Sequence, residues 1–295
     1  MSLRVGVIGA GAFGREHARA YSRIPDARLV SIEDVDPDRA RALAEEFGAT
    51  KGEPPAAVSV VVPVGSRGSL VPDLIARGAA VLVEKPLASS GPAARSLAAL
   101  AEGRAVMVGH VLRFAQPYVE LERRVRGWGP LGGGSLGRVR SAAHAARHPS
   151  DDVVGLTMIH DLDAAPWLAG APVATVSAEG ARGVDGRWVS CDAQLTTTDG
   201  SRWFVHARWD GDDADQRDDA TVTAADGRSA SISLGAADAG VYDDALEAEL
   251  AHFIAHARSG TSSPRLVVAD AARAVEVADA VRRSLEQAGA TIDVH

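Results

Sequence analysis

Six residues near the N-terminus have the types and spacing of a dinucleotide-binding turn. The segment Gly9-Ala10-Gly11-Ala12-Phe13-Gly14 follows an apolar run and opens a helical pattern. The first glycine permits a tight turn, the second lets the backbone approach a pyrophosphate, and the third allows close packing of helix on strand. Free N–H groups at the start of such a helix favour an anion. The predicted phosphate site comprises Gly9, Gly11, Ala12, Phe13 and Gly14.

Asp34 completes this pattern, because it ends the second apolar run 20 residues after Gly14. A carboxylate at that place would accept hydrogen bonds from the hydroxyl groups of an adenosine ribose. Glu33 and Asp36 add negative charge nearby, and Arg39 is the basic side chain that could offset it. A 2′-phosphate about 4 Å from a carboxylate would be repelled by roughly 1–4 kcal/mol, depending on the local dielectric constant. We therefore expect NAD to be preferred over NADP.

Glu84-Lys85-Pro86 closes the fourth apolar run, at the sheet edge where open α/β folds bind ligands. The lysine could donate a hydrogen bond to a substrate oxygen and hold or move its proton. Proline fixes the backbone and raises the frequency of a cis Lys85–Pro86 bond. The alternative is an ordinary loop after a strand. We assign all three residues to the cofactor site, together with Val62 and Pro63 at the end of the third run.

A framework of strands and helices must position these residues, and the first 110 residues supply one. Short apolar runs alternate with helical patterns, which is typical of βαβ units and a parallel sheet. The predicted strands are Leu3–Ile8, Ala27–Asp34, Ala57–Val62, Ala80–Glu84 and Ala105–Gly109. The predicted helices are Phe13–Arg23, Pro37–Phe47, Arg67–Arg77 and Pro92–Glu102.

After Arg113 the pattern changes to one of helices and alternating runs. Helices are predicted near Pro117–Arg126, Leu156–Leu168, Asp244–Arg258 and Val268–Gln287, a turn at Gly132–Gly134 and a strand from Arg138. The alternating runs are Pro172–Ala181, Arg187–Thr198, Arg202–Trp209, Ala220–Ala225 and Arg228–Leu234. Asp199-Gly200 and Asp226-Gly227 separate two pairs of these runs, and Asp-Gly is a strong hairpin signal. We predict an antiparallel meander, with a solvated loop at Asp210–Asp219.

The composition argues against several classes of protein. The 295 residues carry 31 basic and 39 acidic side chains, a formal charge of −8 that suits neither nucleic acid nor anionic lipid as a partner. No run reaches the roughly 18 apolar residues of a membrane helix. The lone cysteine, Cys191, can form no internal disulfide, so we expect a structural thiol in a cytoplasmic protein. His252 and His256 have a metal-ligand spacing, but no third ligand is placed near them, and we expect no metal site.

Taken as a set, these motifs resemble the glucose–fructose oxidoreductase, inositol dehydrogenase and rhizopine catabolism family (Gfo/Idh/MocA). The Gly-rich turn and Glu84-Lys85-Pro86 stand at the family's spacing. Further matches are Gly109–Phe114 with Pro117, Ser135–Val139, Met158–Asp163 and Trp167-Leu168. The resemblance covers nearly the whole chain. It implies an α/β protein with an N-terminal Rossmann domain, whose parallel sheet is doubly wound, and a C-terminal α/β domain with an open, mainly antiparallel sheet.

The resemblance also implies roles for single residues. Lys85 matches the lysine beside the nicotinamide and the reacting hydroxyl, and His160 matches the histidine commonly given the proton-transfer role. Imidazole suits that role because its pKa lies near working pH. Without the motif, His160 would more often be a packed core residue. We expect Arg113, Arg147 and Thr157 to contact the substrate; for Arg113, a structural salt bridge is the alternative.

Two positions depart from the family pattern. The family usually carries an aspartate four residues before the histidine, one helical turn away on the same face, and Leu156 stands there in this chain. Many members also carry a histidine shortly after a Pro-Asn pair that follows the third strand. The corresponding stretch here is Pro63-Val64-Gly65-Ser66-Arg67. Ordinary sugar oxidation is therefore a weaker expectation than the fold.

The function expected from the resemblance is hydride transfer between a nicotinamide and a CH–OH/C=O group of a sugar, cyclitol or nucleotide sugar. The alternatives are a reductase of a non-sugar ketone, imine or conjugated substrate, and a catalytically decayed cofactor-binding or sensor subunit. We expect a dinucleotide-binding domain at 1–116 and a substrate and oligomerisation domain at 117–295, with the last helix, about 268–287, packing back on the first domain. A homodimer or homotetramer formed through the sheet face is expected, with a small-molecule substrate.

Overall fold

The computed structural model describes residues 2–49 and 54–294. They form two compact units, and each unit is built from two stretches of chain. The first unit contains the chain up to Phe114 together with Val241–Ala272, and the second contains Ala115–Gly240 together with the chain from Arg273 onward. The first break lies near the predicted boundary at 116, whereas Val241–Ala272 belongs to the first unit. That the last helix packs back on the N-terminal domain stays a prediction.

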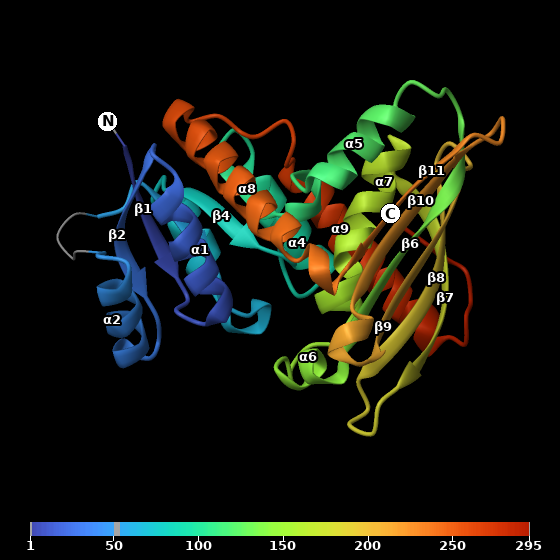
Figure 1. Ribbon diagram of the computed structural model, residues 1–295, viewed down its shortest axis with the longest axis horizontal. Helices are drawn as coiled ribbons and strands as arrows, with labels where there is room; N and C mark the ends of the chain where they lie inside the picture. Colours follow the sequence, from blue (N-terminus) through green and yellow to red (C-terminus); the bar gives the residue numbers. More distant parts are fainter. Residues whose placement is uncertain (1, 50–53, 295) are drawn as a thin grey trace. The chain divides into compact units, whose positions relative to one another are not determined.

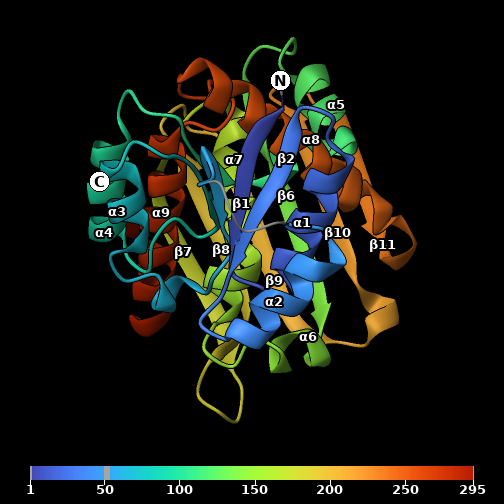
Figure 2. The ribbon, with the colours of Figure 1, turned by 90° about the vertical axis from the view of Figure 1, so that its left-hand side faces the viewer.

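The first unit is built on a parallel sheet with the strand order β2-β1-β3-β4-β5. Its strands are β1 (Leu3–Ile8), β2 (Ala27–Glu33), β3 (Ala57–Val60), β4 (Ala80–Glu84) and β5 (Val106–Gly109). Every residue of β3, β4 and β5 is buried, as expected for strands covered on both faces. Figure 2 shows α1 and α2 on one side of the strands and α3 and α4 on the other. The predicted parallel, doubly wound sheet is confirmed.

Five longer helices belong wholly or mainly to this unit: α1 (Ala12–Arg23), α2 (Pro37–Glu46), α3 (Leu70–Ala76), α4 (Gly91–Ala101) and α8 (Gly240–Ser259). Helix α8 lies along α1, where Arg19 pairs with Asp243 at 3.0 Å (Figure 1). A short 3-10 helix, Val64–Ser66, precedes α3, so Arg67 lies before that helix rather than at its first predicted position. A second 3-10 helix, Val111–Arg113, follows β5.

The second unit contains a seven-stranded sheet in the order β11-β10-β6-β9-β8-β7-β12. The strands are β6 (Leu131–Ser141), β7 (Val173–Arg182), β8 (Trp188–Thr197), β9 (Arg202–Gly211), β10 (Arg217–Ala224), β11 (Ser229–Gly235) and β12 (Ile292–Asp293). Both Asp-Gly hairpins are confirmed. The meander is interrupted, because β6 lies between β9 and β10 and runs parallel to β9. The mainly antiparallel sheet is thus confirmed, but the uninterrupted meander is wrong.

The predicted turn at Gly132–Gly134 is also wrong, since these residues belong to β6. Their glycine character comes from close packing rather than from a change of direction. A Cβ on Gly133 would lie 1.7 Å from the carbonyl oxygen of Arg202, and one on Gly134 would lie 2.7 Å from the ring of Trp203. Likewise, β9 and β10 take up half of the predicted loop Asp210–Asp219, and a segment that contains a 3-10 turn at Asp213–Asp215 separates them.

Helices cover one face of this sheet: α5 (Gln116–Val125), α7 (Ile159–Ala169) and α9 (Val268–Glu286), with the short α6 (Ala142–Ala146) near one end (Figure 1). Helix α9 is tied to β7 by Ser284, whose Oγ accepts the N–H of Ala178 at 2.8 Å. The opposite sheet face carries polar side chains and Phe204, which is 54% exposed.

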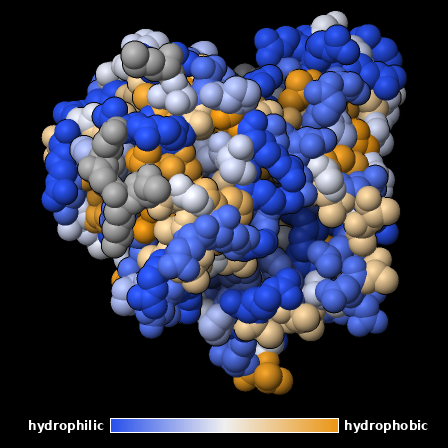
Figure 3. Space-filling model, turned by 60° about the vertical axis from the view of Figure 1, so that its left-hand side comes forward, coloured by the Kyte–Doolittle hydropathy of each residue, from blue (hydrophilic) through white to orange (hydrophobic). Residues whose placement is uncertain are grey.

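Apolar side chains are scattered over the face of the molecule in Figure 3, where hydrophilic residues predominate. Large exposed apolar residues are Phe13, Val35, Val184, Phe204 and Val267. Within residues 2–49 and 54–294, none of the helices combines the length and apolar character that a membrane crossing requires.

Candidate functional site

The Gly-rich turn joins β1 to α1 and leaves room for a ligand on one side only. Gly9 has φ +110°, and a Cβ on it would lie 2.5 Å from the carbonyl oxygen of Val61. A Cβ on Gly14 would lie 1.8 Å from the carbonyl oxygen of Gly9, so neither position accepts a larger residue without movement. A Cβ on Gly11, in contrast, would meet no described atom within 4 Å. The turn is closed toward the protein and open at Gly11.

The start of α1 has the properties of an anion site. Gly11 is the N-cap residue, no described side chain caps the helix, and its first turn carries no acidic residue. The unpaired N–H groups of this turn and the helix dipole favour a phosphate. Gly11, Ala12 and Phe13 are exposed, whereas Gly14 is buried. These residues therefore fit the pyrophosphate of a dinucleotide.

Asp34 follows β2 and holds the Gly-rich turn from the side. Its Oδ2 accepts the N–H of Ala10 at 2.7 Å, and its Oδ1 accepts the N–H of Asp36 at 2.9 Å. Partial burial opposes ionisation, but the N–H groups of Asp36 and Ala10 outweigh it and lower the pKa of Asp34. The carboxylate is thus ionised at neutral pH, next to the turn that fits a pyrophosphate.

Lys85 follows β4, and its peptide bond to Pro86 is cis, as the sequence had suggested. The preceding Glu84 is 6% exposed and is held by two neighbours. Its Oε1 lies 3.1 Å from Nε2 of His17, a fully buried residue of α1. Its Oε2 accepts the backbone N–H of Lys85 at 3.1 Å. Glu84 therefore joins the dinucleotide helix to the peptide group of Lys85.

Arg67 connects the two loops that follow β3 and β4. Its Nε donates to the carbonyl of Val62 at 3.0 Å, and its Nη1 donates to the carbonyl of Pro86 at 2.5 Å. Val62 is half-buried and Pro63 is exposed beside it. Neither Arg67 nor His17 was among the predicted site residues, because their partners lie 19 and 67 residues away in the sequence.

His160 lies in the second unit, at the second residue of α7, and is half-buried. A π-helical turn, Val154–Met158, directly precedes α7, and the N–H of Ile159 bonds the carbonyl of Val154, five residues earlier. Such widened turns occur often at functional sites. Because the turn is wider than in an α-helix, Leu156 does not have the regular one-turn spacing from His160 that was expected. The helix predicted over Leu156–Leu168 thus contains a change of helix type.

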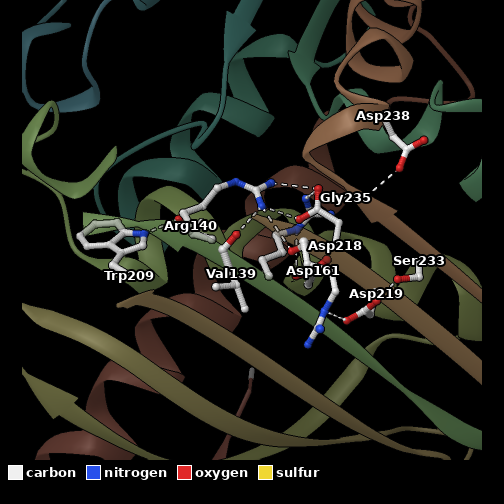
Figure 4. A network of polar contacts seen from close by, with 12 residues as sticks. Val139, Arg140, Asp161, Trp209, Asp218, Asp219, Ser233, Gly235 and Asp238 are labelled. Atoms are coloured by element: carbon white, nitrogen blue, oxygen red, sulfur yellow. Dashed lines mark hydrogen bonds and ion pairs between the residues drawn. The ribbon is translucent and has the colours of Figure 1, made fainter. Parts of the chain in front are cut away.

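A buried ionic network stands directly after His160 (Figure 4). Arg138 Nε lies 2.9 Å from Asp161 Oδ2, and Arg138 Nη1 lies 3.1 Å from Asp218 Oδ2. Arg140 Nη1 lies 2.7 Å from Asp218 Oδ1. Burial raises the pKa of Asp161 to about 6; the positive charge of Arg138 opposes this rise, and Asp218 adds to it. The network fixes the start of α7 to β6 and β10.

The three predicted substrate residues have different surroundings. Arg113 is 5% exposed, and its Nη1 donates to the carbonyl of Arg265 at 2.9 Å and to Asp270 Oδ2 at 3.3 Å. These are the contacts of the structural alternative. Arg147 is exposed after α6. Thr157 is buried, and its Oγ1 accepts the indole N–H of Trp209 at 2.7 Å. A substrate contact for each of them stays a prediction.

The remaining singled-out residues have local partners. Nε2 of His252 lies 2.8 Å from Ser263 Oγ, and Nδ1 of His256 lies 3.1 Å from Thr261 Oγ1. The part of the chain that the structure describes contains no group of three or more metal-ligating side chains. Cys191 is buried in β8, and burial raises its pKa to about 12, in agreement with a structural thiol.

The N-terminal part of the chain matches a known protein family. Residues 3–110 match the GFO_IDH_MocA family, described as an oxidoreductase family with an NAD-binding Rossmann fold. Over these residues, the chain is similar to this family. The resemblance drawn from the Gly-rich turn and Glu84-Lys85-Pro86 is confirmed.

Relatives of known name are similar over part of their length. An inositol 2-dehydrogenase of Burkholderia cenocepacia is 33% identical over 59% of this chain, and one of Acidothermus cellulolyticus is 32% identical over 61%. The chain spans 57% and 58% of the length of these two relatives.

Solved structures share the fold of the whole chain. A myo-inositol dehydrogenase from Corynebacterium glutamicum has a TM-score of 0.86 at 21% identity and covers 100% of this chain and 99% of its own. A scyllo-inositol dehydrogenase from Lactobacillus casei, with bound NAD(H) and scyllo-inositol, has a TM-score of 0.87 at 16% identity, with the same coverage. A UDP-N-acetylglucosamine 3-dehydrogenase from Acidithiobacillus ferrooxidans has a TM-score of 0.84 at 24% identity and covers 97% of this chain and 99% of its own. These TM-scores establish the fold, and both predicted domain types are confirmed.

Proposed function

We propose that this protein is an NAD-dependent dehydrogenase that interconverts CH–OH and C=O groups of a cyclitol, sugar or nucleotide sugar. The observation that carries the proposal lies within the first unit. The turn that fits a pyrophosphate, the ionised Asp34 and Lys85 all follow the carboxyl ends of strands in one parallel sheet, where open α/β folds bind ligands. The names of the relatives and of the solved structures support the substrate class.

The residues that would hold the cofactor are those of the first unit. Gly11, Ala12 and Phe13 would bind the pyrophosphate, Asp34 the adenosine ribose, and the loops at Val62–Pro63 and Glu84–Pro86 the nicotinamide end. A bound nicotinamide supplies the acceptor or donor of a hydride. The protein's part is to orient this group and to manage the substrate proton.

Two side chains would manage that proton. Lys85 would donate a hydrogen bond to the substrate oxygen, and its positive charge would stabilise the negative charge that develops there. His160 would take the hydroxyl proton during oxidation and return it during reduction, since imidazole exchanges protons near neutral pH.

Preference for NAD over NADP belongs to the same proposal. The hydrogen bonds that lower the pKa of Asp34 keep a negative charge where the 2′-phosphate of NADP would come close. Arg39 could offset that charge, and its Nη2 lies 3.7 Å from Oδ2 of Asp36. Parallel fluorescence titrations with NADH and NADPH test this directly. Tighter binding of NADH supports the proposal, and tighter binding of NADPH contradicts the preference. If neither NADH nor NADPH binds, the proposed dehydrogenase function is refuted.

Turnover is tested with NAD and each of three probes: myo-inositol, scyllo-inositol and UDP-N-acetylglucosamine. The chain has two lysines, Lys51 and Lys85, which makes a matched pair of variants possible. Lys85→Met should lower turnover at least about 10²-fold, as expected when a proton-managing group is lost, with NADH binding nearly unchanged. Lys51→Met should turn over like the wild type. Equal turnover in Lys85→Met would remove that residue from the mechanism.

Leu156 favours a second candidate, a reductase of a ketone, imine or conjugated substrate. No carboxylate at position 156 stabilises the charged form of His160. His160 is then less suited to accept the hydroxyl proton during oxidation than to give a proton to the substrate during reduction. Oxidation of NADH by a panel of ketones and cyclic imines, without oxidation of any polyol, would favour this reading. Tight NADH binding with no turnover of the carbonyl compounds or of the polyols would favour a catalytically decayed cofactor-binding or sensor subunit.

The assembly that we propose is a homodimer or homotetramer formed through the open sheet face of the second unit. Phe204 lies at a depression of about 280 Å³ on this face, lined by residues of β7, β8 and β9 and by Gly289. Phe204→Arg should shift the protein toward monomer in light scattering, whereas Val184→Arg, at an exposed turn, should not. An unchanged mass for Phe204→Arg would exclude this face. A cytoplasmic location, where NAD is available, completes the proposal.

A further inference from the structure

Arg67 links two loops that lie beyond the pairing of β3 with β4. The ladder between β3 and β4 extends from Ala57–Ala80 to Val60–Val83, and the chain leaves the sheet soon after. Beyond that point, Arg67 bridges the loops with its Nε on the carbonyl of Val62 and its Nη1 on the carbonyl of Pro86. A third, longer bond of 3.4 Å reaches the carbonyl of Leu87.

Arginine is suited to this bridge for a physical reason. Its guanidinium is planar, permanently charged and carries five N–H donors in a fixed fork. Two acceptors bound to one fork are fixed in distance and direction, which the single ammonium of a lysine cannot achieve. The side chain is 7% exposed, so competition from water is weak, and a charged donor makes the stronger kind of hydrogen bond.

The loop after β4 is held from its other end by Glu84. The carboxylate of Glu84 accepts the N–H of Lys85, while Arg67 binds the carbonyl of the next residue, Pro86. The backbone on both sides of the Lys85 side chain is therefore fixed by buried polar groups. The carbonyl of Val62 connects this arrangement to the loop that would also contact the nicotinamide.

From this geometry we propose that Arg67 is a positioning residue. It fixes the Lys85 loop relative to the Val62–Pro63 loop, so that the Lys85 side chain lies beside the bound nicotinamide. The inference rests on the proposed function. Arg67, the donor of this bridge, belongs to the stretch Pro63–Arg67 that departs from the pattern of the resembled family.

The test uses NADH as the probe and compares the wild type with Arg67→Ala, Arg67→Lys and Arg104→Ala. Arg104 is the matched control, since its Nη1 also donates to a backbone carbonyl, that of Ile75 at 2.8 Å, away from both loops. Amide hydrogen exchange is measured over peptides containing 61–67 and 84–88, with and without NADH. The emission spectrum and dissociation constant of bound NADH are measured in parallel.

In Arg67→Ala, exchange in both loops should rise about tenfold or more, as expected when a hydrogen bond to a charged donor is lost. The emission of bound NADH should shift toward that of free NADH, which a purely structural role would not cause. Arg67→Lys should protect one loop only, and it replaces the alanine variant if that variant does not fold. Arg104→Ala should leave both readouts unchanged.

Wild-type emission and exchange in both Arg67 variants, with NADH bound, would overturn the positioning role while leaving the proposed function intact. Faster exchange with an unchanged NADH spectrum would also overturn it, because Arg67 would then be a structural link only. If the wild type itself binds no NADH, the proposed function is refuted, and the positioning role with it.

Discussion

Replacing Asp161 by asparagine should change how the stability of the second unit depends on pH. The side chain is fully buried beside Arg138, and burial raises its pKa to about 6 against the opposing charge of Arg138. In the unfolded chain an aspartate has a pKa of about 3.9. Between about pH 4 and pH 6, the folded protein therefore keeps a proton that the unfolded chain has lost.

The sign and size of the effect follow from proton linkage. Where the folded state binds more protons than the unfolded state, the free energy of unfolding falls as pH rises. A difference of about 2 pKa units, at 1.36 kcal/mol per unit, gives a loss of about 3 kcal/mol between pH 4 and pH 7. Asparagine has nearly the same shape and does not titrate. Relative to the wild type, Asp161→Asn should therefore gain about 3 kcal/mol over this interval.

Urea unfolding followed by tryptophan fluorescence measures this difference. All five tryptophans, at positions 128, 167, 188, 203 and 209, lie in the second unit, so the signal reports that unit. Asp226→Asn is the control that should stay nearly flat over this interval, because the side-chain hydrogen bond from Arg228 lowers the pKa of Asp226 and its titration therefore affects stability only near pH 4 and below. A difference between Asp161→Asn and wild type that stays constant from pH 4 to pH 7 would refute the reasoning. It would mean that the ion pair with Arg138 offsets the burial.

Three further outcomes are expected. Gly11→Ala should keep the wild-type melting temperature but weaken NADH binding. Gly14→Ala should weaken NADH binding and also destabilise the protein by about 1–3 kcal/mol, because its Cβ would meet the carbonyl of Gly9. Equal melting temperatures of the two variants would contradict this expectation. Leu156→Asp should raise alcohol oxidation at neutral pH if a carboxylate there supports His160; an unchanged pH–rate profile would show that the π-helical turn keeps the two apart. Burial and the charges of His256 and Arg265 lower the pKa of His252 to about 4. As pH falls from 6.5 to 4, the unfolded chain takes up a proton at this histidine that the folded protein does not, so the first unit should lose stability. Thermal melts by circular dichroism should show this loss in the wild type and not in His252→Asn.

Local patterns predicted the first unit well because its strands and turns are specified by neighbouring residues. The glycines at 9, 11 and 14 and the acid at 34 each act within one βαβ segment, so their spacing alone indicates their roles. The cis bond before Pro86 is likewise a property of two adjacent residues.

Long-range packing explains what the sequence did not reveal. The position of β6 between β9 and β10 depends on pairing across about 70 to 90 residues, and nothing in the alternation of β6 distinguishes a turn from a crowded strand. Gly134 is small because Trp203 packs over it. Arg67 and His17 gain their significance only from partners on other strands, and the π-helical turn before His160 has no signal in residue type.

The division of each unit into two stretches of chain has a consequence for the synthesis of this protein on the ribosome. Helix α8 contributes the buried Glu249, Leu250 and Phe253 to the first unit, yet it is made only after the 126 residues Ala115–Gly240 of the second. At a translation rate of about 5–20 residues per second, synthesis of these 126 residues takes roughly 6–25 s, during which the first unit lacks α8. Throughout this interval the nascent first unit exposes the apolar surface that α8 will cover, and we expect chaperones that bind at the ribosome exit to recognise that surface.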